Sequence, residues 1–223
     1  MRPDLSFAEV TAERHLGLPI RLTGATRALE PAQLTPGEVV RWRALPAGTR
    51  SSEWLLGRAA LRQLLTRLHH PADTSQLTFP NRQVSLTHSG RTAVAAWSGG
   101  TRSPDGRAVL GVGVDVQTNR SGLNQRAGHL FLSARELAWV ASLAEAVQAD
   151  ARLRLWVIKE ALFKANPANH DTVLAHYSIA QPSAPYGNGS GPCPPKTSLR
   201  YASLRVVFGH LAVAACLGRL PCP

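Results

Sequence analysis

The sequence predicts an α+β fold built from two halves, and three observations support this prediction. Each part of the chain offers helix-forming segments and strands that suit antiparallel pairing, without a regular strand–helix alternation. A Gly- and Ser-rich loop over residues 98–106 separates the two parts. The chain has 223 residues, 44% of them hydrophobic, which suffices for a sizeable core. We therefore expect an N-terminal half over 1–105 and a C-terminal half over 106–223.

Charge and composition limit the classes of function. The net charge is +11, mostly from arginine, and it divides into +6 over residues 1–110 and +5 over 111–223. This dispersed positive charge suits anionic partners. A nucleic-acid-binding protein is a weaker alternative, because aromatic residues make up 6% of the chain and no basic run or known motif is present.

Other features bear on where the protein works. No apolar run approaches the ~20 residues that span a bilayer, and the first residues do not resemble a secretory signal. We therefore expect no membrane partner. The three cysteines are odd in number and lack the spacing of a metal site. A reducing, cytoplasmic setting fits this pattern; the cysteines are Cys193, Cys216 and Cys222.

Two helices and two strands are expected in the N-terminal half. Residues 50–68 carry a leucine stripe at helical spacing, and a shorter helix over 38–45 precedes Pro46. Residues 84–97 are expected to form two apolar strands that meet at a polar turn over 87–90. A histidine in such a turn, here His88, is most often simply hydrated. The first forty residues predict no particular element.

The strand expected over residues 109–117 has two different faces. Alternation places three valines on one face, which we assign to the core, and Gly111, Gly113, Asp115 and Gln117 on the other. Glycines without side chains imply that another segment approaches the backbone closely. A lone aspartate at a strand end is commonly satisfied by a turn, which is the simpler interpretation of Asp115.

A helix over residues 152–164 is the element around which the chain is organised. It has no internal Gly or Pro, Asp150 is a candidate N-cap, and Asn166 and Pro167 form a stop signal. The helix is apolar on nearly all sides, so the carboxylate of Glu160 needs a partner. An ion pair with Lys164 one turn later, worth about 0.2–0.5 kcal/mol, would be the structural explanation. A divalent cation such as Mg²⁺, held by oxygens of Asp115, Gln117 and Glu160, would be the functional one.

The remaining segments of the C-terminal half are weaker predictions. Residues 133–147 should form a helix, because Ser133 and Glu136 have capping-box spacing. A strand is expected near 173–179, and the Pro/Gly/Ser-rich segment 180–197 is expected to be a flexible loop. Residues 199–217 are expected to form a β-hairpin.

Three segments together resemble the Sfp-type 4'-phosphopantetheinyl transferases. They are Thr-His-Ser-Gly at 87–90, Gly-Val-Gly-Val-Asp-Val at 111–116 and Trp-Val-Ile-Lys-Glu-Ala-Leu-Phe-Lys at 156–164, and their order and spacing match the family. Phe-Leu-Ser-Ala-Arg-Glu at 131–136 resembles a further family segment. The resemblance covers roughly residues 40 to 217. It implies two similar α+β halves, related by a pseudo-two-fold axis, with the active site in the cleft between them.

The resemblance also implies a reaction. Such an enzyme moves the phosphopantetheine arm of coenzyme A to a serine of an apo acyl or peptidyl carrier protein and releases adenosine 3',5'-bisphosphate, with Mg²⁺ as cofactor. By analogy, Asp115, Gln117 and Glu160 would hold the metal, and Glu160 and Lys164 would be catalytic. The residues implied in binding coenzyme A are Arg50, Arg58, Arg82, Thr87, His88 and Lys159. The family analogy also places carrier docking near residues 123–131 and the helix that follows them.

The sequence departs from the family at two positions. Arg82 stands in a region where the family usually has a Gly-Lys-Pro segment, and only this arginine offers a replacement charge. Gln117 stands where bacterial relatives have a third acidic ligand, so we expect weaker metal affinity without coenzyme A. A non-catalytic relative that binds coenzyme A or carrier proteins is the alternative. We expect a monomer, because the two halves can form the cleft without a second subunit.

Overall fold

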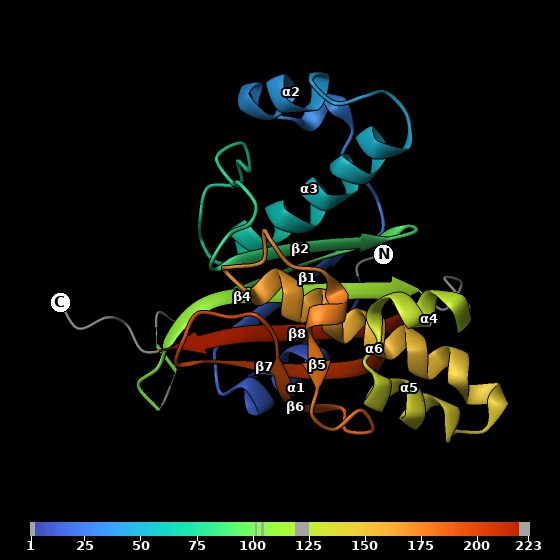
Figure 1. The fold of residues 1–223 in the computed structure, drawn as a ribbon. Helices are drawn as coiled ribbons and strands as arrows, with labels where there is room; N and C mark the ends of the chain where they lie inside the picture. The colour runs from blue at the N-terminus through green and yellow to red at the C-terminus, as the bar shows by residue number, and fades with distance from the viewer. Residues whose placement is uncertain (1–2, 101, 104, 119–124, 219–223) are drawn as a thin grey trace.

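The computed structural model describes residues 3–100, 102–103, 105–118 and 125–218. Over these residues the protein is an α+β structure with two antiparallel sheets (Figure 1). The α-helices are α1 (Ser6–Leu16), α2 (Pro36–Arg43), α3 (Thr49–Arg67), α4 (Gln125–Phe131), α5 (Ala134–Ala141) and α6 (Glu145–Ala165). The strands are β1 (Ile20–Ala25), β2 (Val84–Ser89), β3 (Thr92–Ser98), β4 (Ala108–Thr118), β5 (Ser178–Ile179), β6 (Tyr186–Ser190), β7 (Thr197–Val206) and β8 (Gly209–Gly218).

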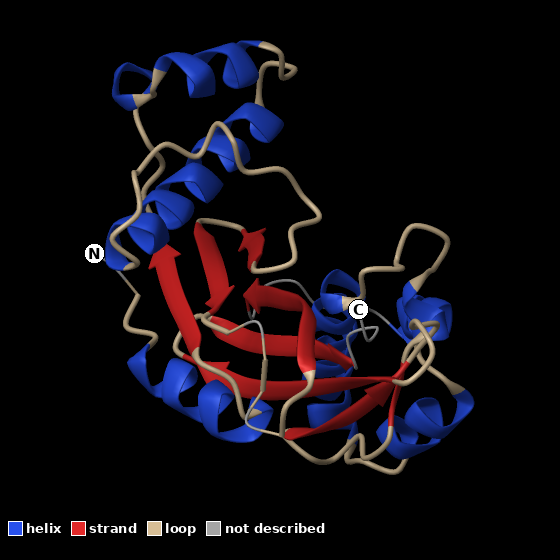
Figure 2. Ribbon diagram, turned by 90° about the vertical axis from the view of Figure 1, so that its left-hand side faces the viewer, coloured by secondary structure: helices blue, strands red, loops and turns tan. Residues whose placement is uncertain are grey.

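The smaller sheet has the order β1-β3-β2 and is covered on one face by α3 (Figure 2). The leucine stripe predicted for α3 is buried here, with Leu61 and Leu64 packed against Val84 and the alanines of β3. At Gly57, an added Cβ would lie 3.0 Å from Leu86, so the glycine brings the helix close to β2. This packing forms a core between α3 and the smaller sheet.

The larger sheet has the order β4-β8-β7-β6-β5 and is covered on both faces. Helix α6 lies across β4, β8 and β7 on one face, and α1 packs against β7 and β1 on the other. The valines of β4 pack with residues of α1, β1 and β3, as expected for a core face. The cores of the two halves are therefore joined rather than independent.

The two sheets meet edge to edge at β2 and β4, and side chains make the junction. From Val112 onward, every second N–H group of β4 donates a hydrogen bond toward the β2 side. The Val112 N–H group bonds to the Arg82 carbonyl oxygen, whereas the next three bond to hydroxyl side chains. We call these three side chains the hydroxyl ladder; its members are Ser85, Thr87 and Ser89. The ladder leaves the edge of β4 satisfied without ordinary strand pairing.

The glycine face of β4 is where α6 makes its closest approach. A Cβ added at Gly113 would overlap the carbonyl oxygen of Ala161, and one added at Gly111 would overlap that of Ala165. The prediction that some segment approaches this face closely is confirmed, and that segment is the central helix. The helix and the strand are thus in main-chain contact beside Asp115.

The helices of the C-terminal half have different bounds from those expected. Helix α6 begins at Glu145, so the predicted N-cap Asp150 lies inside the helix. The capped helix is real, because the Ser133 hydroxyl accepts the N–H of Glu136, but it ends at Ala141 instead of continuing to 147. The predicted stop at Asn166 is confirmed. The spacing of apolar residues does not fix where one helix ends and the next begins, so the bounds of α5 and α6 differ from the prediction.

Other segments also differ from expectation. The segment 180–197 contains β6, so the expectation of an unpacked flexible loop is corrected. The strand fits because Gly189 lies against Leu162, where a Cβ would be 2.7 Å from the leucine side chain. Only Ser178–Ile179 of the strand expected over 173–179 forms. In the first forty residues, where no element was predicted, α1 and β1 form.

The terminal hairpin is confirmed as β7 and β8. The polar turn of the N-terminal half is tighter than predicted, because residues 87–89 remain in β2 and the chain reverses at Gly90. Within the part of the chain that the structure describes, no helix has the length and apolar character needed to cross a membrane.

Candidate active site

Asp115 lies at the centre of the candidate site, on the face of β4 that meets α6. Its side chain is buried, and one oxygen, Oδ1, accepts hydrogen bonds of 2.7 Å from both the Thr87 hydroxyl and the Lys164 ammonium group. The other oxygen, Oδ2, is buried and has no hydrogen-bond partner. A buried carboxylate oxygen without a partner is costly, so it invites a ligand that can supply positive charge.

Glu160 and Lys164 lie one helical turn apart on α6 and face Asp115. The Lys164 Nζ atom is 4.0 Å from a Glu160 oxygen and 2.7 Å from Asp115. Burial raises the pKa of Glu160, and the negative charge of Asp115 raises it further, while Lys164 acts in the opposite direction. The predicted Glu160–Lys164 pair is present but long, and the closer partner of the lysine is Asp115. Two carboxylates therefore share one ammonium group.

Gln117 follows Asp115 on the same face of β4. Its side-chain oxygen accepts a 3.0 Å hydrogen bond from the Ser89 hydroxyl, which fixes the orientation of the amide. The structure thus brings Asp115 and Gln117 onto one face of the strand that meets α6, and Glu160 and Lys164 onto the facing surface of the helix.

Lys159 does not join this group, although it precedes Glu160 in the sequence. It is fully buried on another side of α6, where its ammonium group contacts Glu136 at 2.7 Å and donates to the Phe131 carbonyl oxygen at 2.6 Å. Burial lowers the pKa of Lys159, and Glu136 opposes that shift. This lysine therefore links α6 to the segment between α4 and α5.

His88 and Thr87 point in different directions from β2. The Thr87 hydroxyl is turned toward Asp115, whereas His88 is exposed and its Nδ1 atom lies 4.0 Å from a carboxylate oxygen of Glu53 on α3. A hollow of about 710 Å³ opens beside Glu53 and Gly90, with Arg27 and Arg91 in its wall. His88 thus lies near a surface hollow at the end of α3.

Arg82 and Lys164 line the same cavity. Its Nε atom donates a 2.7 Å hydrogen bond to the Val109 carbonyl oxygen, at the start of β4. A cavity of about 370 Å³ lies between Arg82 and Lys164, with Pro80, Leu110 and Asn166 among its walls. Two cations from different halves of the chain therefore line one cavity.

The two arginines assigned to coenzyme A on α3 lie elsewhere. Arg50 is exposed in the first turn of the helix. Arg58 is buried, stacks on Trp54 with a centroid distance of 4.6 Å, and donates to the Thr74 carbonyl oxygen at 3.3 Å. Burial lowers the pKa of Arg58 to about 10, and nearby Arg41 adds to the shift. Arg58 thus has partners at the α2–α3 junction.

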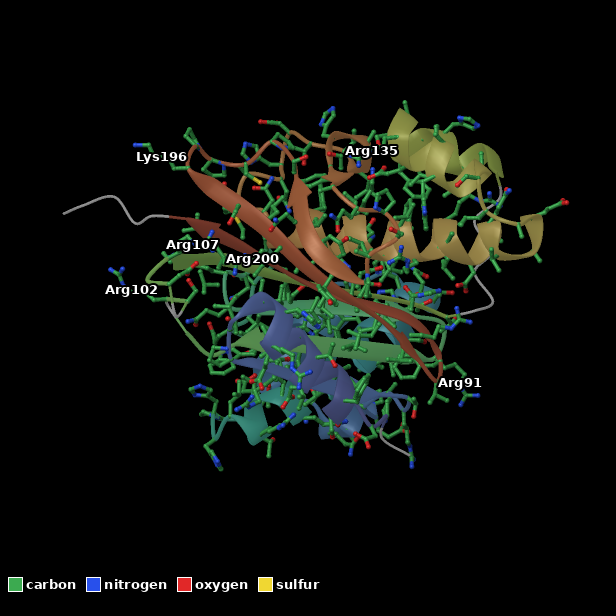
Figure 3. The ribbon with its side chains drawn as sticks, turned by 90° about the horizontal axis from the view of Figure 1, so that it is seen from below. Arg91, Arg102, Arg107, Arg135, Lys196 and Arg200 are labelled. Carbon is green, nitrogen blue, oxygen red and sulfur yellow. The ribbon has the colours of Figure 1, made fainter. Side chains whose placement is uncertain are left out.

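The positive charge is distributed over several places. Figure 3 shows one group of cations at one end of the larger sheet, while Arg91 and Arg135 lie apart from it. Asp105 pairs with two members of that group, at 2.5 Å from Arg107 and 3.7 Å from Arg200. The other members are Arg102 and Lys196.

The residues present fit a hard divalent cation. Mg²⁺ prefers oxygen ligands and commonly takes one or two protein carboxylates together with water and phosphate oxygens. The unpartnered oxygen of Asp115 and the desolvated carboxylate of Glu160 supply such ligands. Among the described residues, no group of three His, Cys, Asp or Glu side chains could hold a metal ion. This agrees with the amide at position 117, which leaves two carboxylates.

Sequence reasoning missed the roles of Ser85 and Ser89. The pattern Ser-x-Thr-x-Ser over residues 85–89 places three hydroxyls on one face of a strand, which was the available signal. A polar face that is buried needs hydrogen-bond partners. Here those partners come from β4.

Comparison with known proteins finds similarity for one part of the chain. No curated protein matches the chain. Residues 111–179 match the model of the 4'-phosphopantetheinyl transferase superfamily. The matched region begins at the glycine face of β4 and includes Asp115, Glu160 and Lys164. This match supports assignment of the C-terminal half to the 4'-phosphopantetheinyl transferase superfamily.

Proposed function

We propose that the protein is a Mg²⁺-dependent 4'-phosphopantetheinyl transferase of the Sfp type. It would transfer the phosphopantetheine arm of coenzyme A to a serine of an apo acyl or peptidyl carrier protein and release adenosine 3',5'-bisphosphate. The observation that carries the proposal is the convergence of Asp115 and Glu160 on Lys164, with one oxygen of Asp115 left without a partner. The superfamily match over the same residues supports it.

Asp115 and Glu160 would hold the metal, and the amide oxygen of Gln117 could complete the protein ligands. Mg²⁺, when bound, supplies positive charge next to the pyrophosphate of coenzyme A. Lys164 would then turn from Asp115 toward the oxygen that leaves with adenosine 3',5'-bisphosphate. Its charge would offset the negative charge that develops there.

Glu160 would take the proton of the attacking serine, directly or through a water molecule. The serine oxygen forms a bond to the phosphorus that carries the pantetheine arm, and the bond from that phosphorus to the bridging oxygen breaks. The electron pair leaves with the adenosine bisphosphate, and the proton passes to a Glu160 oxygen. Without metal, burial raises the pKa of Glu160, and Lys164 acts in the opposite direction.

Coenzyme A would lie between the two halves. The cavity between Arg82 and Lys164 offers two cations to its phosphates, and His88 offers another group at the surface of the N-terminal half. Arg50 could reach a phosphate from the exposed end of α3. Lys159 and Arg58 would act indirectly, because their charged groups are already engaged with protein partners.

The carrier protein would approach near α4. Leu130 on that helix is 78% exposed, which suits an apolar contact with a partner. Residues 123 and 124 of the docking region expected from the sequence lie outside the described residues. We infer that the enzyme acts as a monomer, because one chain supplies all the residues named above. The free thiols of Cys193 and Cys216 suit a reducing, cytoplasmic setting.

The deciding experiment incubates the protein with coenzyme A, Mg²⁺ and an apo carrier domain and measures the mass of the carrier. We expect a mass gain of one phosphopantetheine arm, which chelation of the metal should abolish. Asp115→Ala and Glu160→Ala should each lower the rate at least about a hundredfold. Glu145→Ala is the matched control, because it removes an exposed carboxylate from the same helix, and it should remain active.

Other outcomes would select other functions. Binding of coenzyme A without any mass gain would identify a non-catalytic relative. Tight binding of nucleic acid without binding of coenzyme A would identify a nucleic-acid-binding protein. Full activity of Asp115→Ala or Glu160→Ala would refute the assignment of the site.

A further inference from the structure

Each of the three side chains of the hydroxyl ladder accepts a hydrogen bond from a main-chain N–H group of β4. Ser85 accepts the N–H of Val114 at 3.0 Å, and Ser89 accepts that of Thr118 at 3.3 Å. Between them, Thr87 accepts the N–H of Val116 at 3.4 Å. All three side chains are buried. As acceptors alone, they would be a purely structural junction between the sheets.

Two members also donate their proton to a side chain of the candidate site. The Thr87 hydroxyl donates to Asp115 Oδ1 at 2.7 Å, and the Ser89 hydroxyl donates to Gln117 Oε1 at 3.0 Å. A hydroxyl has one proton, so a group that accepts a main-chain N–H and donates to an oxygen has a fixed orientation. Ser85 lies beside the glycine face of β4, where residue 113 has no side chain to receive its proton.

The donation from Thr87 makes the two oxygens of Asp115 unequal. Oδ1 receives two donors, Thr87 and Lys164, whereas Oδ2 receives none although it is buried. Lys164 belongs to the proposed catalytic machinery and must move when substrate binds. The Thr87 side chain is buried and its hydroxyl is already engaged with β4, so its hydrogen bond to Asp115 can persist throughout.

We propose that Thr87 is a positioning residue, which holds Asp115 by Oδ1 so that Oδ2 is the oxygen presented to a divalent cation. This inference rests on the proposed function, because it assumes that Asp115 is a metal ligand. It assigns Thr87 to the metal side of the site rather than to direct contact with coenzyme A. Residues that orient a metal ligand in this way typically contribute about 10- to 100-fold to metal affinity.

The ladder supplies its own control. Thr87→Val keeps the shape of the side chain but removes both hydrogen bonds of the hydroxyl. Ser85→Ala removes the matching main-chain hydrogen bond without touching a ligand. Thr87→Ser keeps the hydroxyl and should restore the contact. If the ladder were only a junction, Thr87→Val and Ser85→Ala would behave alike.

The test measures binding of Mn²⁺, as a paramagnetic substitute for Mg²⁺, by the loss of the free-ion electron paramagnetic resonance signal. Wild-type protein and each variant are titrated in the presence of coenzyme A. We expect Thr87→Val to weaken Mn²⁺ binding about 10- to 100-fold. Thr87→Ser and Ser85→Ala should stay close to wild type. Should Thr87→Val fail to fold, Thr87→Ala takes its place, with the same expectation.

Two results would overturn the proposal while leaving the proposed function intact. One is wild-type Mn²⁺ binding by Thr87→Val in a protein whose wild-type form transfers the phosphopantetheine arm. The other is an equal loss of binding in Ser85→Ala and Thr87→Val. A wild-type protein that neither binds Mn²⁺ with coenzyme A nor transfers the arm would overturn both.

Discussion

Helix α6 carries two lysines that each pair with a buried carboxylate, and the two pairs are built differently. Lys159 contacts Glu136, and Lys164 contacts Asp115, both at 2.7 Å. In the first pair both side chains are fully buried, and both oxygens of Glu136 accept further hydrogen bonds, from the N–H groups of Ser133 and Ile179. In the second pair Lys164 is 27% exposed, and one oxygen of Asp115 has no partner.

The difference separates a pair whose hydrogen bonds are satisfied from one that we propose to be functional. A buried ion pair stabilises a fold only when its remaining donors and acceptors are satisfied, and the Glu136 pair meets that condition. The Asp115 pair keeps an unsatisfied oxygen and a partner that can reach solvent. Such incomplete sites are expected where a protein binds a ligand. The predictions below test this contrast, from the largest expected change in stability to the smallest.

Breaking the structural pair should have the largest effect. Lys159→Met leaves Glu136 buried without a cation, which should cost about 3–5 kcal/mol of the free energy of unfolding. Urea denaturation measures this loss. The double variant Lys159→Met, Glu136→Leu should recover much of it, because no charge is left unpaired. If the double variant were as unstable as the single one, packing rather than charge would explain the loss.

Glu38 is another fully satisfied carboxylate, and it predicts a pH dependence. Burial would raise its pKa, but hydrogen bonds from Arg62 and Thr74 outweigh that effect and lower it to about 2. The stabilisation is therefore complete above the ordinary value of 4.5 and is lost as the pH falls toward about 2. Glu38→Gln should be about 1–3 kcal/mol less stable at neutral pH. Its stability should change less than that of wild type across this acid range.

That comparison is made by urea denaturation at a series of pH values, followed by circular dichroism. Glu30→Gln is the control, because this residue is exposed and lies in the same region of the chain. If the free energy of unfolding changed with pH equally in wild type and Glu38→Gln over this acid range, other carboxylates would be the cause of the pH dependence.

Asp115→Asn should change stability by less than about 1 kcal/mol, because wild type already leaves one oxygen unsatisfied and the released Lys164 can be hydrated. The matched change Glu136→Gln should cost clearly more. Thermal unfolding of the two variants provides the comparison. Equal losses would mean that the Asp115 pair is structural as well. Transfer activity should be lost only in Asp115→Asn if Glu136→Gln still folds.

The smallest change in stability is expected for Gln117→Glu. A third carboxylate near Asp115 and Glu160 should cost less than about 1 kcal/mol without metal, because Ser89 can still donate to position 117. It should strengthen Mg²⁺ binding in the absence of coenzyme A, as titration calorimetry would detect. Gln63→Glu on α3 is the control for added charge. Equal metal dependence of wild type and Gln117→Glu would show that position 117 is not a ligand.

Much of the fold could be predicted because periodicity was strong where packing was regular. The two faces of β4, the leucine stripe of α3 and the terminal hairpin follow directly from apolar spacing. Helix α1 could not be predicted in this way, since its outward face carries exposed Phe7 and Val10 and so blurs the pattern. Strand β6 was missed because its alternating glycines resemble a loop.

The members of the candidate site could be named from the sequence, but their partners could not. Lys159 and Glu160 are neighbours in the sequence, but their side chains point to different sides of α6. Hydrogen bonds between segments far apart in the chain, such as Thr87 with Asp115, depend on how the two sheets meet. That junction is made mostly by side chains, and the Ser-x-Thr-x-Ser pattern of residues 85–89 indicates a hydroxyl face without showing which strand it meets.

The main-chain contact between β4 and α6 has a consequence for how this protein can diverge. Because Gly111 and Gly113 let the helix lie directly on the strand, the spacing of the candidate site is set by backbone atoms and not by its polar side chains. Position 117, which we propose as a ligand, can therefore carry an acid or an amide without a change in the distance between strand and helix. Position 113 cannot vary in this way, because any residue larger than glycine would force α6 away from β4.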